Sequence, residues 1–265
     1  MLTSKEIAEN YLVLGRKKAQ APLGRLLVLS MLAGAFIALA GAVSTTASCT
    51  VENSSLAKVV SACLFPGGLA LVILAGTELF TGNCLLVVPL LRGELRLREV
   101  LRSWVTVYLG NFAGALLVAA VCVWGHQLDL FSGKLAAATI STAAAKCTLS
   151  FGDAFFRGVA CNFLVCMAVW LAMGAKSAGG KLAALYFPVL FFVLCGFEHS
   201  IANMYYIGAG LFAQTVPAYA APAAGLTVGG FLLGNLLPVT LGNMAGGMLV
   251  GVAFWFCWLR EPEKG

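Results

Sequence analysis

Long apolar segments alternate with short polar connections along this chain, and windows of about 20 apolar residues predict six membrane-spanning helices. The second and fifth windows are too long for one straight crossing and contain polar residues, so we expect interruptions at 76–83 and 196–203. The sixth is also long, and Pro238 predicts a kink in it. The windows lie at about 25–47, 59–90, 104–125, 155–175, 183–212 and 227–259.

Composition supports an all-α integral membrane protein. Hydrophobic residues make up 60% of the 265 residues and charged residues 11%, with a mean hydropathy of +0.93. A soluble domain carries about 25% charged residues, which excludes that class. The net charge of +6 does not indicate a nucleic-acid partner, because the basic residues are dispersed between the apolar segments.

The distribution of basic residues predicts the orientation in the membrane. Thirteen of the 17 lysine and arginine residues, Lys264 among them, fall on alternate connections, so we expect both termini in the cytoplasm. Residues 1–24 form a modestly amphipathic segment that we expect on the inner membrane surface, in contact with lipid, as an anchor. Residues 25–260 are expected to form a single transmembrane domain.

Two segments of the chain indicate an internal duplication. LGNFAGALLV at 109–118 and LGNMAGGMLV at 241–250 are identical at seven of ten positions. GTELFTGN at 76–83 and GFEHSIAN at 196–203 share Gly, Glu and Asn at the same offsets. Each half holds three predicted spans, and an odd number inverts the second half, so we expect inverted repeats at about 25–126 and 155–259.

The predicted interruptions carry ionisable residues at membrane depth, Glu78 in the first and Glu198 with His199 in the second. Burying such groups is expensive, so they are candidates for a site that passes a polar solute. The alternative is that the glycines allow close helix packing and the glutamates form structural hydrogen bonds. The nine cysteines include no CxxC pair, and we expect no metal or cofactor.

Four segments resemble the formate/nitrite transporter family, and the likeness covers about residues 5–260. This resemblance implies a 3+3 inverted repeat of six helices with an aquaporin-like protomer, broken second and fifth helices and a homopentamer with one pore per protomer. It also implies a channel for small monovalent anions in the bacterial cytoplasmic (inner) membrane, not an enzyme. The segments are ELFTGN at 78–83, CNFLVCMAVW at 161–170, GFEHSIANM at 196–204 and LPVTLGNMAGG at 237–247.

By motif position, the resemblance implies that His199 is the central pore histidine and Thr81 the threonine of the first interruption. Asn162 matches the asparagine beside the pore, and Lys146 matches the basic residue of the outer vestibule. We expect Glu198 to hold Lys146 or backbone donors of the interruption.

The same resemblance implies two apolar constrictions. Phe65 and Leu69 are expected on the cytoplasmic side, and Val165 and Phe192 on the outer side. Asn203 is a further candidate residue at the pore. The alternative role of a gate for residues 1–24 is implied only by this resemblance.

An anion crossing such constrictions would lose its hydration without replacement, whereas a neutral acid crosses far more easily. We therefore expect Lys146 to attract the anion and a proton to be added near His199, donated by the imidazole or by water. Formate is the favoured substrate, with nitrite, hydrosulfide and short carboxylates as alternatives within the family.

Two other classes of membrane protein fit parts of this sequence. A membrane-embedded enzyme could use Glu198, His199 and Thr81 as an acid/base set, but HExxH, GxSxG and P-loop motifs are absent from the sequence. A neutral-solute pore of aquaporin type would fit an inverted repeat, but its paired Asn-Pro-Ala loops are also absent.

Overall fold

The computed structural model describes residues 1–219 and 223–260, and the described residues form helices and connections without strands. Lys264, one of the basic residues behind the predicted orientation, lies outside the described residues. The longer helices are α1 (Ser4–Ala19), α2 (Leu23–Ser48), α3 (Ser54–Leu64), α4 (Pro66–Leu74), α7 (Leu97–Trp124), α8 (Lys134–Cys147), α9 (Phe151–Gly174), α10 (Ala178–Leu194), α11 (Ser200–Ala213) and α12 (Leu237–Trp258).

Five of the described helical segments are long and apolar enough to cross a membrane. Two shorter apolar segments accompany them, Ala178–Leu194 and Phe80–Leu91, of which the second combines α5 (Phe80–Asn83), η1 (Cys84–Leu86) and α6 (Val87–Leu91). The five long segments are Leu23–Ser48, Ser54–Leu74, Leu97–Trp124, Phe151–Gly174 and Gly230–Trp258.

The predicted second and fifth spans are each interrupted near the middle. The helix ending at Leu74 is followed by Gly76 with φ +66°, and helical structure resumes at Phe80. In the same way α10 is followed by Gly196 with φ +70°, and α11 begins at Ser200. A positive φ is strained for a residue with a Cβ, so glycine at these two positions lets the chain leave the helix sharply.

Two buried asparagines hold the interruptions in place. Asn111 of α7 donates to the carbonyls of Ser30 (2.7 Å) and Glu78 (2.9 Å) and accepts from the Phe80 amide (2.9 Å). Such bonds satisfy backbone groups that leave the helix in an apolar surrounding.

Asn243 of α12 makes the equivalent bonds at the other interruption. It donates to the carbonyls of Gly158 (2.8 Å) and Glu198 (2.9 Å) and accepts from the Ser200 amide (2.9 Å). Asn111 and Asn243 are the asparagines of the two matching LGN motifs, so the similar sequences do similar structural work.

Glycines bring α2 against α7 and α9 against α12 at backbone distance. A Cβ on Gly114 would lie 1.9 Å from the Met31 carbonyl oxygen, and one on Gly246 would lie 2.1 Å from that of Val159. Small residues commonly mediate this approach between helices in membranes.

In the sixth window, where Pro238 predicts a kink, a π-helical segment, η3 (Gly230–Leu236), ends two residues before this proline. The wider turn ends beside the proline, whose ring disfavours continuation of the preceding α-helix. Asn235 of this segment is fully buried and contributes to the site below.

Helix α1 packs against the rest of the protein through one face. Its buried face includes Ile7, Tyr11 and Leu12, and the Tyr11 ring lies 6.4 Å from that of Trp170 in α9. Arg102 donates to the carbonyls of Ala19 (3.3 Å) and Ala21 (3.1 Å) at the end of the helix. An isolated sequence window could not reveal that this apolar face has a partner in the same chain.

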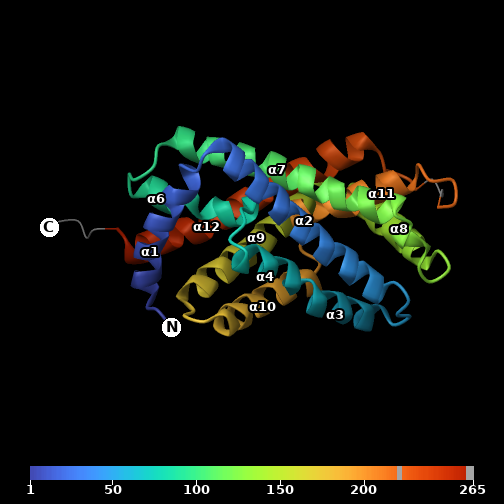
Figure 1. The fold of residues 1–265 in the computed structure, drawn as a ribbon, viewed down its shortest axis with the longest axis horizontal. Helices are drawn as coiled ribbons and strands as arrows, with labels where there is room; N and C mark the ends of the chain where they lie inside the picture. Colours follow the sequence, from blue (N-terminus) through green and yellow to red (C-terminus); the bar gives the residue numbers. More distant parts are fainter. Residues whose placement is uncertain (220–222, 261–265) are drawn as a thin grey trace.

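The elements form an elongated bundle (Figure 1). Helices α1 and α6 lie at one end, together with the end of α12, and α8 lies at the opposite end. Helix α4 and the interruption that follows it lie between these ends.

Candidate functional site

The two interruptions meet at His199 and Thr81. The imidazole Nε2 and the Thr81 hydroxyl oxygen are 3.0 Å apart, and both side chains are buried. The residues are 118 positions apart in the chain, so the pair joins the two regions that carry the unusual polar residues.

The hydrogen bond at Nδ1 of His199 determines which tautomer the neutral imidazole adopts. Nδ1 accepts a hydrogen bond from the Ala202 amide at 3.1 Å, which makes His199 the N-cap of α11. Because an amide N–H can only donate, Nδ1 carries no proton in this arrangement, and the neutral imidazole carries its proton on Nε2. His199 therefore donates to Thr81, and the Thr81 hydroxyl hydrogen is available to another acceptor.

His199 lines a small apolar space, here called the central cavity. Its volume is about 10 Å³, which is room for about one water molecule. Of the described residues around it, His199 is the only polar one. The lining consists of Ile37, Phe65, Leu69, Leu79, Val165, Val189, Phe192 and His199.

Two larger cavities adjoin the central cavity. The Lys18 cavity, about 230 Å³, shares Leu69 and Leu79 with it. The Lys146 cavity, about 810 Å³, shares Phe65, Phe192 and His199 with it. The three spaces therefore follow one another along the molecule and are separated by apolar side chains.

Phe65 and Leu69, predicted to form one constriction, both line the central cavity but border different larger cavities. Phe65 lies with Phe192 at the boundary of the Lys146 cavity, and their rings meet edge to face at 5.7 Å. Leu69 is paired instead with Leu79, which sequence reasoning did not single out. Phe65 precedes Leu69 by one helical turn, so the two residues lie at different depths of the same passage, which a motif match cannot resolve.

A charged cluster occupies the wall of the Lys146 cavity. Lys146 Nζ donates to both carboxylate oxygens of Glu198 at 2.9 Å, and Asn203 donates to the same carboxylate at 2.6 Å. Asn235 accepts from Asn203 at 2.8 Å and donates to the Lys146 carbonyl at 2.9 Å. The lysine thus satisfies the carboxylate, as expected from the sequence for Glu198, and Asn203 acts through Glu198.

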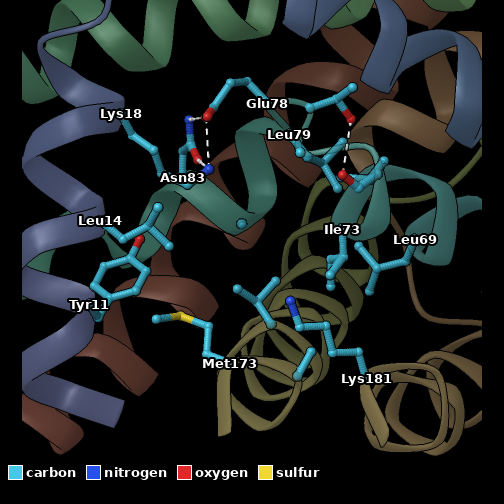
Figure 2. Close-up of a pocket in the computed structure, with 16 residues that line it drawn as sticks. Tyr11, Leu14, Lys18, Leu69, Ile73, Glu78, Leu79, Asn83, Met173 and Lys181 are labelled. Carbon is cyan, nitrogen blue, oxygen red and sulfur yellow. Dashed lines mark hydrogen bonds and ion pairs between the residues drawn. The ribbon is translucent and has the colours of Figure 1, made fainter. Parts of the chain in front are cut away.

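The Lys18 cavity carries a similar cluster (Figure 2). Lys18 of α1 donates to Glu78 at 2.9 Å and to Asn83 at 3.2 Å, and Asn83 donates to Glu78 at 2.8 Å. Glu78 and Asn83 occupy the offsets of Glu198 and Asn203 in the two similar motifs, which is a signal available in the sequence. Lys18 had no such signal, because its place depends on how α1 docks.

Asn162 lies beside the central pair without lining any of the three cavities. Its amide donates to the carbonyls of Thr81 (3.1 Å) and Asn243 (2.6 Å), so it braces the first interruption against α12. In the described residues no cluster of three or more His, Cys, Asp or Glu side chains could hold a metal ion.

The matching family model is that of the formate/nitrite transporters, and it covers residues 5–256. The chain belongs to the formate/nitrite transporter family. It is 38% identical over 263 residues to a protein of Methanothermobacter thermautotrophicus named "Probable formate transporter", covering 92% of each. It is 34% identical to the formate channel FocA of Escherichia coli K12, covering 89% of this chain and 87% of FocA.

Structures agree with this assignment. A structure described as a pentameric formate channel with formate bound superposes with a TM-score of 0.81 at 30% identity, covering 92% of this chain and 99% of that one. A channel of the same family superposes with the same TM-score at 31% identity, covering 96% of this chain and 98% of that one. This family member is therefore a multi-pass membrane protein, and its relatives are channels and transporters, not enzymes.

Proposed function

We propose that this protein is a homopentameric channel for formate, with one conduction path in each protomer. The observation that carries this proposal is the sequence of three cavities, in which the central cavity, lined by His199, shares lining residues with each of the other two. The names of the relatives and of the structural neighbour support formate and the pentamer. Nitrite and hydrosulfide remain the alternatives within the family.

We infer a 3+3 inverted repeat behind this path. The equivalent bonds of Asn111 and Asn243, together with the two Lys–Glu–Asn clusters, support this inference. Under this arrangement each half supplies one interruption to the same midpoint. The excess of basic residues on alternate connections supports cytoplasmic termini in a bacterial inner membrane.

The solute crosses the central cavity as the neutral acid. Phe65, Phe192, Leu69 and Leu79 offer a carboxylate no hydrogen-bond donor in exchange for its water, and an unpaired charge there is strongly unfavourable. Uptake should therefore increase as external pH falls, because the protonated fraction of the acid grows.

Water at the Lys146 cavity is the better candidate for the proton source than His199. Protonating the ring at Nδ1 would break the hydrogen bond that Nδ1 accepts from the Ala202 amide. The new Nδ1–H and the Ala202 N–H would then point at each other, which disfavours the imidazolium. The imidazole then serves as a neutral donor that orients Thr81.

Counterflow in liposomes containing the purified protein tests this function. Preloaded formate should accelerate uptake of labelled formate, more strongly at acidic external pH, whereas glycerol should not exchange. Faster exchange of nitrite or hydrosulfide would assign one of those substrates instead. Failure of all three anions to exchange, with intact pentamers in the same preparation, would contradict the proposal.

A further inference from the structure

The Lys18 cavity lies between α1 on one wall and α10 on the other (Figure 2). Its lining is mainly apolar, and of the described residues around it three carry a formal charge: Lys18, Glu78 and Lys181. The sum of these charges is +1. Which lysine carries this charge decides where an anion would be held.

The charge of Lys18 is already matched. Its ammonium group binds Glu78 at 2.9 Å and Asn83 at 3.2 Å, and Asn83 closes the triangle by donating to Glu78. An anion approaching Lys18 would have to compete with a carboxylate in direct contact. Lys18 is therefore a partner of Glu78 more than a binding group for solute.

Lys181 of α10 has no such partner. No hydrogen bond or ion pair of its ammonium group occurs among the residues that the structure describes. The side chain is partly buried, and Figure 2 shows its nitrogen directed into the cavity, across from the Lys18, Glu78 and Asn83 cluster. The net positive charge of the cavity thus resides on Lys181.

The opposite wall supplies an unused donor. The hydroxyl of Tyr11 in α1 is buried and has no hydrogen-bond partner, although the ring lines the same cavity. Leaving a buried hydroxyl without a hydrogen-bond partner is unfavourable, so its persistence calls for an explanation. Burial raises the pKa of the Tyr11 phenol, so the group remains a donor at physiological pH.

We propose that Lys181 and Tyr11 make the Lys18 cavity a binding site for a small monovalent carboxylate before it enters the central cavity. The site offers one unmatched positive charge and one unmatched hydroxyl, which fits one anion. A dianion would carry one negative charge more than Lys181 can neutralise, and this charge would lie near Glu78. The site is therefore expected to favour monoanions over dianions, in addition to selecting small solutes. This inference rests on the proposed function, for which it names the residues that receive solute at the α1 end.

Binding can be measured separately from flux. Purified protein in nanodiscs is titrated into ¹³C-formate, and line broadening of the formate signal reports the bound fraction. We expect Lys181→Gln to weaken binding by roughly fivefold, as for the loss of one partly hydrated charge-assisted hydrogen bond, and Tyr11→Phe by about threefold. Lys181→Arg should retain most of the affinity, because it keeps the charge.

Lys176→Gln is the matched control. This substitution removes an equal charge five residues earlier, and Lys176 does not line the cavity. In liposomes, Lys181→Gln should raise the KM for formate by a similar factor and leave uptake of neutral formamide unchanged. Equal binding by Lys181→Gln and the unmodified protein would overturn the proposal even if transport is normal. Binding that depends on Lys181 in a protein without formate flux would sustain the site and reject the proposed function.

Discussion

His199 caps a helix with one ring nitrogen and faces the proposed solute path with the other. Nδ1 caps α11 through the Ala202 amide, while Nε2 contacts Thr81 beside the central cavity. Stability and conduction are therefore linked in one side chain. A substitution of His199 can therefore change both the stability of the protein and the uptake of solute.

Substitution of His199 can separate the two roles. Asparagine accepts at helix N-caps, so His199→Asn should keep the cap, whereas His199→Phe should lose about 1 kcal/mol of stability. His199→Phe should also reduce formate uptake at acidic external pH by at least about tenfold, since the central cavity then loses its polar group. Melting curves and liposome uptake measure the two effects. Unaltered uptake and pH dependence in the phenylalanine variant would refute the assigned role.

At the scale of the element, close helix packing fixes where the interruptions lie. Gly246 and Gly114 place α12 and α7 against the backbones of α9 and α2, and Asn243 and Asn111 then reach the interrupted segments. The interruptions, their glutamates and the matching LGN motifs were all predictable from the sequence, because a repeat and an ionisable residue in an apolar window are local signals. The docking of α1 and the depth of Phe65 were not, because both depend on contacts between distant segments.

Gly246→Ala tests this packing. The added Cβ would meet the Val159 carbonyl at 2.1 Å, so we expect a loss of about 2–3 kcal/mol or failure to assemble. Gly152→Ala in the paired helix α9 is the control, because nothing lies within 4 Å of its added Cβ. Thermal unfolding can be followed with a thiol-reactive dye after the exposed Cys63, Cys195 and Cys257 are replaced by serine, so that the signal reports on the buried Cys84, Cys161 and Cys166. Equal melting of the two variants would contradict the packing argument.

At the scale of the whole molecule, both ends of the proposed path carry a lysine that a glutamate neutralises. Lys146 contacts both oxygens of Glu198, and Lys18 contacts Glu78. Removing one partner of a buried pair leaves a lone charge, which is usually worse than removing both. The sequence suggested that Lys146 attracts the anion, whereas the geometry gives it a carboxylate to bind first.

A double-mutant cycle measures this balance. Lys146→Met should destabilise the protein by roughly 3 kcal/mol and reduce formate uptake, because Glu198 is left unpaired. The double variant Lys146→Met with Glu198→Gln should recover most of the stability and part of the uptake. Additive losses in the double variant, seen by melting and liposome assays, would mean that the two residues act independently.

The glycine contacts have a consequence for how such a protein can acquire new substrates. Where main chains touch directly, the backbones set the distance between the two helices, and this distance cannot change with neighbouring side chains. No glycine is among the described residues that line the central cavity. Selectivity could therefore be retuned over evolution by exchanging a handful of lumen side chains, while the frame that positions them stays untouched.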